Sequence, residues 1–232
     1  TCVYHHYYTE QAAGICLKEE YQSSLLGGFQ EVHTDLEKAD RVYQAIRRKI
    51  SYMDLRRIYK CFLSTVPDKE MILLRYIVLG FHIGSGISKL HGNPDVFAAQ
   101  EIEKKINVEA ERMRQFVRFS VMQGDILYAR IEPDHDVLEL IGDHFSDRFR
   151  NDPFLIHDVR RGKAMAGYQG KWYITSFAEN DVPEESEEEK EYQALWQKYF
   201  DHIAIKERKN SNCQRNFMPL RYRKHLTECQ MR

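Results

Sequence analysis

The pattern of apolar positions between residues 34 and 86 predicts a layer of helices. Apolar residues recur there at the intervals of three and four that place side chains on one face of a helix, as in Leu36, Ala39, Val42, Tyr43 and Ile46. Thr34 and Asp35, just before this run, are suited to cap the first helix. Residues 54–63 and 68–83 continue the pattern, so the first part of the chain is expected to be helical.

A further helix is expected to begin at residues 93–94, an Asn-Pro pair, and to run directly into a strand. After the helical spacing ends, residues 115–122 change towards the alternation of apolar and polar side chains that is typical of strands. A Gly-Asp pair at 124–125 supplies the positive φ angles of a tight turn. Residues 126–131 alternate again, and the two segments are therefore predicted to form a hairpin.

The remaining pattern predicts two more helices and three more strands. Residues 137–149 have the apolar spacing of a helix. Three later segments read as short strands, namely residues 154–159, 164–169 and 172–177. A Gly-Lys pair at 170–171 is expected at the last turn between them. After an acidic connection, a final helix is expected at about residues 187–204.

Five short strands in succession, with one helix inserted, favour an α+β fold over a doubly wound parallel sheet. We expect a small antiparallel sheet packed with helices, a helical N-terminal layer and a basic C-terminal segment. The chain is expected to form a single domain. Its three parts would be mainly helical, then a helix with the sheet, and then the acidic connection, a helix and the basic segment, over residues 1–92, 93–178 and 179–232.

Composition indicates an ordinary globular protein. Lys and Arg number 34 against 35 Asp and Glu, so the global charge predicts neither a nucleic acid nor a membrane as partner. Residues 71–87 are the most apolar stretch, but Arg75, His82 and three glycines interrupt it, and we expect no membrane span. The five cysteines form no CxxC pair, which favours reduced thiols and a cytoplasmic location. Because the chain begins at Thr1, we expect a preceding segment to be missing.

Local charge is most uneven near the carboxyl end. Nine basic residues stand there against three acids, and they are Lys198, Lys206, Arg208, Lys209, Arg215, Arg221, Arg223, Lys224 and Arg232. Because basic side chains neutralise phosphates and flat rings stack on bases, this segment, with Phe217 and Tyr222 among its cations, is a candidate nucleic-acid surface. The alternative is a solvated helix that docks on the core through Phe217, Met218 and Leu220. A second basic run lies at residues 41–60.

A third group combines histidines, an acid and arginines: His144, Arg148, His157, Asp158, Arg160 and Arg161. His144 and Arg148 are four residues apart on a predicted helix and so share a face. His157 and Asp158 are neighbours on a predicted strand, where successive side chains point to opposite faces, so they are not expected to be partners. The group could bind a phosphate or transfer a proton. The alternative is that these residues form structural ion pairs.

Common short motifs of enzymes are absent from the sequence. There is no Gly-rich phosphate loop, no GxSxG and no HExxH. Cys213, His225 and Cys229 are possible metal ligands, but a fourth ligand at a suitable spacing is missing. We therefore expect neither a metal nor a cofactor.

Five segments carry a family resemblance: TCVYHHYY at 1–8, RMRQFVRF at 112–119, HFSDRF at 144–149, IHDVRR at 156–161 and NFMPLRYRKHLTE at 216–228. In this order they resemble a bacterial family of probable DNA metabolism proteins, which carries a domain of unknown function. The resemblance spans nearly the whole chain. Family members usually begin with a short strand and an Asp-Gly turn, and this chain lacks both, which agrees with a missing N-terminal segment.

The resemblance implies a role in DNA metabolism without an established activity. Members are encoded beside a radical S-adenosylmethionine protein, and some are fused to a uracil-DNA glycosylase-like domain. This chain resembles the stand-alone form. It has no closely spaced cysteine triad for the iron–sulfur cluster of radical chemistry, so such chemistry would belong to the partner.

Three hypotheses follow. The first is a DNA metabolism or repair accessory protein that binds a radical S-adenosylmethionine partner and nucleic acid. Its candidate phosphate-binding residues are Arg112, Arg118, Arg148, Arg160, Arg161, Arg215, Arg221, Arg223 and Lys224. The second is an enzyme acting on a nucleobase or nucleotide, with His144 or His157 as the acid–base group and Asp158 as its orienting partner. The third is a non-catalytic scaffold that only holds its partner.

Overall fold

The computed structural model describes residues 1–9, 11–21, 28–203 and 210–229. Contacts within the chain divide it into two compact units, Thr1–Asn107 and Val108–Arg232, which we call the helical unit and the sheet unit. Helix α5 (Pro94–Phe116) contributes residues to both. The expectation of a single domain with internal boundaries at residues 92 and 178 stays a prediction.

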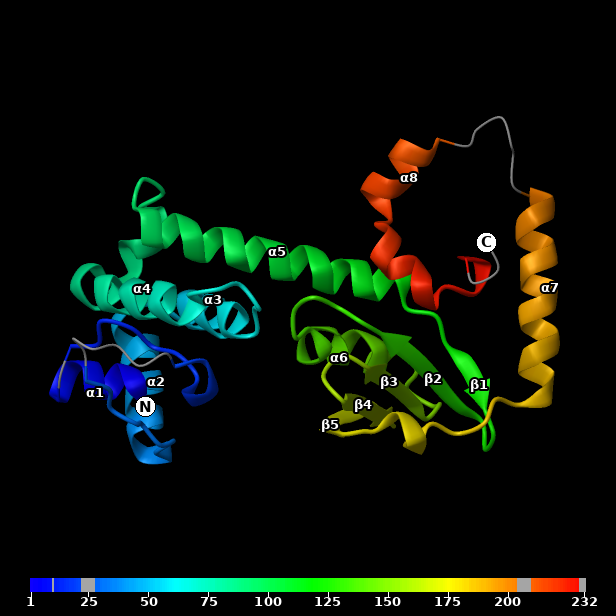
Figure 1. Ribbon diagram of the computed structural model, residues 1–232, viewed down its shortest axis with the longest axis horizontal. Helices are drawn as coiled ribbons and strands as arrows, with labels where there is room; N and C mark the ends of the chain where they lie inside the picture. Colours follow the sequence, from blue (N-terminus) through cyan, green and yellow to red (C-terminus); the bar gives the residue numbers. More distant parts are fainter. Residues whose placement is uncertain (10, 22–27, 204–209, 230–232) are drawn as a thin grey trace. The chain divides into compact units, whose positions relative to one another are not determined.

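The helical unit confirms the helices that the apolar spacing predicted (Figure 1). It contains α1 (Cys2–Tyr8), η1 (Lys18–Glu20), α2 (Leu36–Lys49), α3 (Tyr52–Phe62), α4 (Lys69–Ile83), η2 (Gly84–Lys89) and the first part of α5, where η marks a short 3₁₀ helix. Asp35 caps α2, because its side chain accepts a 3.0 Å hydrogen bond from the backbone N–H of Lys38. The apolar faces of these helices bury side chains such as Ile46, Leu74 and Ile77.

A buried carboxylate joins several helices of this unit. The Asp54 side chain on α3 accepts hydrogen bonds of 2.5–3.0 Å from Ser51, Arg57, Tyr76 and Ser88. Burial favours a higher pKa for Asp54, but the hydrogen bonds from Ser51, Ser88 and Tyr76 and the charge of Arg57 outweigh it, so its pKa is lowered. Arg57 also donates to Glu103 of α5 at 2.6 Å. The cluster therefore links α3, α4, η2 and α5 within one unit.

The segment Lys69–Lys89, which comprises α4 and η2, is long and apolar enough to cross a membrane by length and composition. The core helix of a soluble protein meets the same criterion. In the described structure 33% of the segment's most apolar window is buried, and Leu73, Tyr76 and Ile77 of α4 are among the buried residues. The expectation that the protein has no membrane partner stays a prediction.

The sheet unit confirms the expected α+β class and a sheet of five strands, in the order β1-β2-β3-β4-β5. The strands are β1 (Ser120–Met122), β2 (Ile126–Ile131), β3 (Phe154–Asp158), β4 (Lys163–Tyr168) and β5 (Lys171–Ser176). The sheet is mixed, however, and the expectation of an antiparallel sheet is wrong for one pair, because β2 and β3 are parallel. The inserted helix α6 (Leu138–Arg148) is the crossover connection that a parallel pair requires.

Two details at the strand ends differ from the sequence prediction. Helix α5 continues to Phe116, so the first strand is shorter than residues 115–122. The last turn is formed by Gln169 and Gly170, which have φ angles of 52° and 72°, one position earlier than predicted. The turn predicted at residues 124–125 has its two positive φ angles, 82° at Gly124 and 59° at Asp125.

The core of the sheet unit lies where the end of α5 and helix α6 pack on one face of the sheet (Figure 1). Ala129, Ile131 and Ile156 point to this face from β2 and β3, and Phe145 meets them from α6. Gly142 of α6 lies against the Trp172 ring of β5, and a Cβ atom at Gly142 would stand 2.5 Å from that ring.

The chain then continues from the sheet through η3 (Glu179–Asp181), α7 (Glu187–Ile203), α8 (Ser211–Phe217), η5 (Leu220–His225) and η6 (Thr227–Cys229). Helix α7 contacts β1, where the Glu189 carboxylate accepts a hydrogen bond from the backbone N–H of Val121. Tyr222 of η5 is buried in the core of the sheet unit. The carboxy-terminal segment therefore docks on this unit, as the alternative interpretation expected, but it does so through Tyr222. Phe217 and Leu220, two of the residues expected to make this contact, are exposed.

Candidate functional site

Three arginines converge on one residue at the carboxyl ends of β2 and β3. Nη1 of Arg221 lies 2.6 Å from Oδ2 of Asp134, and Nη1 of Arg160 lies 3.4 Å from its Oδ1. Nη2 of Arg161 donates to the backbone carbonyl of Asp134 at 2.5 Å. We call these three arginines with Asp134 the arginine cluster. Arg160, Arg161 and Arg221 were all predicted as phosphate-binding residues, and the structure brings them together.

The parallel pairing of β2 and β3 creates this site. Because the two strands run in the same direction, the segments that follow them emerge at the same edge of the sheet. The segment after β2 carries Asp134, and the turn after β3 carries Arg160 and Arg161. Arg221 reaches the same place from η5. Four residues from three distant parts of the sequence thus meet at one edge.

Two buried acids hold the residues of the arginine cluster in place through hydrogen bonds. Asp158, at the end of β3, is fully buried and accepts a 2.8 Å hydrogen bond from Arg161. Burial raises the pKa of Asp158, and the hydrogen bonds and charge of Arg161 only partly offset this effect. Glu109 of α5 is 3% exposed and was not singled out from the sequence. Its carboxylate accepts hydrogen bonds from the backbone N–H groups of Asp134 and His135, at 2.9 and 2.7 Å.

Tyr222 connects Glu109 to the arginines. Its hydroxyl donates to Glu109 at 2.8 Å and accepts from Nη2 of Arg221 at 2.9 Å. The guanidinium groups of Arg221 and Arg112 lie 4.8 and 6.0 Å from the centre of the Tyr222 ring, within the range of cation–π contacts. Glu109 therefore fixes both the segment that carries Asp134 and the ring on which Arg221 rests.

Exposure differs between the residues of the cluster and the acids that support it. The side chains of Arg160, Arg221 and Asp134 are 58%, 50% and 40% exposed, whereas those of Asp158 and Glu109 are 0% and 4% exposed. Burial lowers the pKa of Arg221, but its hydrogen bond to Tyr222 and the charges of Asp134 and Glu109 outweigh it, so its pKa is raised. A ligand approaching from solvent thus meets two guanidinium groups together with the Asp134 carboxylate that they share, and guanidinium groups are suited to anions with several oxygens.

The other predicted phosphate-binding residues lie outside this arrangement. Lys224 pairs with Glu132 at 2.6 Å, and Arg223 donates to the backbone carbonyl of Met218. Arg118 donates to the Gln115 carbonyl at the end of α5. Arg148 of α6 lies over the Phe149 ring, and Arg215 is exposed on α8. The expected basic residues at 206, 208, 209 and 232 lie outside the described residues.

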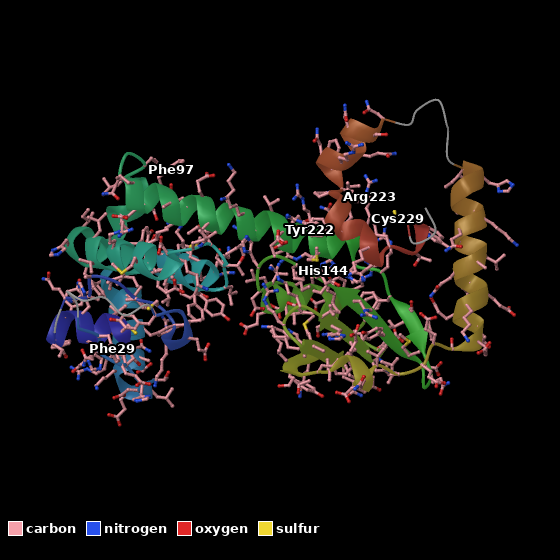
Figure 2. The ribbon with its side chains drawn as sticks, in the orientation of Figure 1. Phe29, Phe97, His144, Tyr222, Arg223 and Cys229 are labelled. Atoms are coloured by element: carbon pink, nitrogen blue, oxygen red, sulfur yellow. The ribbon has the colours of Figure 1, made fainter. Side chains whose placement is uncertain are left out.

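The predicted acid–base residues lie in three different surroundings. His144 is exposed on α6, where Figure 2 labels it, and its ring meets the Phe145 ring edge-on. His157 is buried in β3, with its Nδ1 atom 2.9 Å from the Tyr128 hydroxyl. Asp158 points to the opposite face of β3, towards Arg161. The structure therefore does not bring these three side chains into one pocket.

The hollow beside the cluster is small. It has a volume of about 20 Å³ and is lined by residues including Met113, Ile131 and Tyr222. This is room for roughly one water molecule.

Within the described ranges, no group of three or more His, Cys, Asp and Glu side chains could hold a metal ion. Cys213 is exposed on α8, whereas His225 and Cys229 are partly exposed.

The buried histidine gives a prediction on pH. Burial and the charge of Arg130 lower the pKa of His157, so the unfolded chain, with its ordinary value of 6.5, takes up a proton first as the pH falls. The stability that neutral, buried His157 contributes is therefore fully present above pH 6.5, and it is lost as the pH falls from 6.5 through the pKa of His157 in the folded protein. We expect His157→Gln to flatten the decline in the free energy of unfolding between about pH 7 and pH 5, measured by urea denaturation.

The raised pKa of Asp158 acts in the opposite direction, because it favours the folded protein as the pH falls. Asp158 is the same in the wild type and in His157→Gln, so the difference between their pH profiles of the free energy of unfolding reports the effect of His157. Identical profiles would show that burial does not hold His157 neutral.

Comparisons with known proteins give one match. The model of a family described as a domain of unknown function, DUF4130, matches residues 67–228. No curated protein and no solved structure matches the chain. The matched range contains every residue of the arginine cluster, together with Glu109, Asp158 and Tyr222.

Proposed function

The chain belongs to the DUF4130 family, whose function is unknown, and on this premise we propose that it is a nucleic-acid-binding accessory protein of DNA metabolism. The arginine cluster is its phosphate-contacting surface. The observation that carries the proposal is the pair of exposed guanidinium groups, Arg160 and Arg221, that share the carboxylate of Asp134 above two buried acids.

The chemistry of the guanidinium group supports a phosphate as ligand. Each guanidinium has five N–H donors in a planar fork that matches the oxygens of a phosphate. Arg160 uses Nη1 for Asp134, and Arg221 uses Nη1 for Asp134 and Nη2 for Tyr222. The Asp134 carboxylate holds the two groups at one place, so little side-chain freedom is lost when a phosphate binds. Backbone phosphates carry no sequence information, and this contact would position the protein on nucleic acid without reading bases.

The family resemblance supports the rest of the proposal. In this proposal the protein acts in the cytoplasm beside a radical S-adenosylmethionine protein. That partner supplies the chemistry, and this chain supplies the contact with DNA. His144, His157 and Asp158 lie apart in the described structure, so no observation favours an acid–base enzyme. A scaffold without DNA affinity is the alternative that the next experiment separates.

The test compares two double variants of the full chain. Arg160→Ala/Arg221→Ala removes the exposed cations of the cluster. We expect the dissociation constant for fluorescent DNA at about 50 mM salt to rise roughly tenfold or more, because two phosphate contacts are lost. Arg150→Ala/Lys171→Ala removes two exposed cations near the Gln169–Gly170 turn, at the opposite end of the strands.

The control variant is expected to bind DNA like the wild type, and circular dichroism verifies that each variant is folded. Binding that falls equally in both variants would indicate nonspecific attraction to net charge. If the wild type binds neither single-stranded nor double-stranded DNA, the protein is a scaffold and the proposal is wrong.

A further inference from the structure

The helical unit contains an open groove between α1, α2 and the end of α4. The groove has a volume of about 600 Å³, within the range of roughly 300–1,000 Å³ that is usual for small-molecule sites. Its aromatic and cationic lining consists of Tyr4, Tyr7, Tyr8, Arg41, Arg48, Lys49 and Phe81. It belongs to a different unit from the arginine cluster and shares no residue with it.

Aromatic rings line part of the groove. Tyr4 and Tyr8 stack with their ring centres 4.4 Å apart and their planes 27° apart. Tyr7 meets Phe81 edge-on at 5.7 Å. Tyr8 and Tyr7 remain 69% and 45% exposed, so part of each ring is accessible to a ligand. Exposed, already ordered rings are the platform on which flat bases stack.

Cations of α2 line the groove beside these rings. The Arg41 guanidinium lies 5.4 Å from the centre of the Tyr4 ring, and Lys49 lies 5.9 Å from that of Phe81. Arg48 is exposed, and its Nε–H donates to the Gln44 carbonyl of its own helix at 3.4 Å. Among the lining residues Asp40 is the one acid, so the groove carries an excess of positive charge.

We infer that this groove binds a nucleotide, with the base stacked on the exposed tyrosine rings and the phosphate held by Arg48 and its neighbours. An acidic peptide would use the cations but not the rings, and an apolar ligand would use the rings but not the cations. A nucleotide uses both. The ligand can be a free nucleotide or one nucleotide of a single strand, which offer the same chemistry.

The test uses the full chain and two matched double variants. Tyr8→Ala/Arg48→Ala removes one exposed ring and one exposed cation of the groove. Tyr43→Ala/Arg47→Ala makes the same chemical change at exposed positions of α2 that do not line it. Binding of fluorescein-labelled oligo-dT of five nucleotides is followed by anisotropy, and binding of free thymidine monophosphate by calorimetry. Thermal melting verifies the fold of each variant.

We expect the groove variant to lose about tenfold or more in affinity for at least one probe, since a stacking platform and a phosphate contact are removed together. The control variant should bind like the wild type. Affinity for the oligonucleotide but not for the monophosphate identifies a single strand as the ligand, and affinity for both identifies the free nucleotide as sufficient.

Any of the following results would overturn the inference: no binding of either probe, equal loss in both variants, or equally tight binding of polyglutamate, which has charge but no base. The Arg160→Ala/Arg221→Ala variant separates this site from the arginine cluster, because it leaves the groove intact. Binding of the short probes that is lost in that variant and kept in the groove variant would also contradict the inference.

Discussion

Replacing Glu109 with alanine is expected to lower the free energy of unfolding of the sheet unit by about 3–5 kcal/mol. The carboxylate accepts hydrogen bonds from two backbone N–H groups and the Tyr222 hydroxyl, at 2.7–2.9 Å, in a place that is 3% exposed. Without it, three donors lose their acceptor in a buried site. Because Tyr222 also supports Arg221, the same change should weaken DNA binding at the arginine cluster.

Tryptophan fluorescence in urea is the measurement for this prediction, because both tryptophans of the chain, Trp172 and Trp196, belong to the sheet unit. Glu111→Ala is the matched control. Glu111 lies on the same helix and pairs with Arg114, but its side chain is 56% exposed, so Glu111→Ala is expected to unfold like the wild type. A loss below about 1 kcal/mol in Glu109→Ala would contradict the supporting role of Glu109.

Asp54→Ala should have an effect of similar size on the helical unit, about 3–5 kcal/mol. Asp54 is 1% exposed, and its removal leaves the hydroxyl groups of Ser51, Tyr76 and Ser88 without their acceptor, while Arg57 keeps only Glu103 as its acid partner among the described residues. Far-UV circular dichroism during thermal unfolding is the readout, because the chain has no tryptophan in this unit.

Glu37→Ala, at an exposed position of α2, is the control and is expected to unfold like the wild type. Asp54→Asn keeps the shape of the side chain and an acceptor oxygen, so it should be less destabilising than alanine. If asparagine and alanine are equally mild, the carboxylate does not hold this unit together.

Local patterns in the sequence predicted the elements well, because periodicity reports which face of a segment is buried. The helical spacing of residues 137–149 and the alternation of residues 154–159 correspond to α6 and β3. Pairing direction is a property of two strands and of the path between them, so alternation could not reveal that β2 and β3 are parallel. The inserted helix was the available signal, since a crossover is what a parallel pair requires.

The candidate site was only half predictable for a related reason. Arg160, Arg161 and Arg221 were singled out for their charge, but Arg221 lies sixty residues after Arg161 in sequence, and only the fold brings it to Asp134. Asp158 was singled out as well, as an orienting acid, whereas Asp134 and Glu109 were missed because an isolated carboxylate in a charged chain looks solvated. Glu109 did carry a signal, since it follows Ile106 by three residues on the apolar face of a helix.

The salt dependence of DNA binding tests the central claim most directly. For the wild type and for Arg160→Ala/Arg221→Ala, the logarithm of the affinity for duplex DNA is plotted against the logarithm of the salt concentration. If the two arginines neutralise phosphates, the slope for the variant should be smaller by about two, close to one for each lost contact. Equal slopes for the two proteins would contradict the assignment of the arginine cluster as the phosphate-contacting surface.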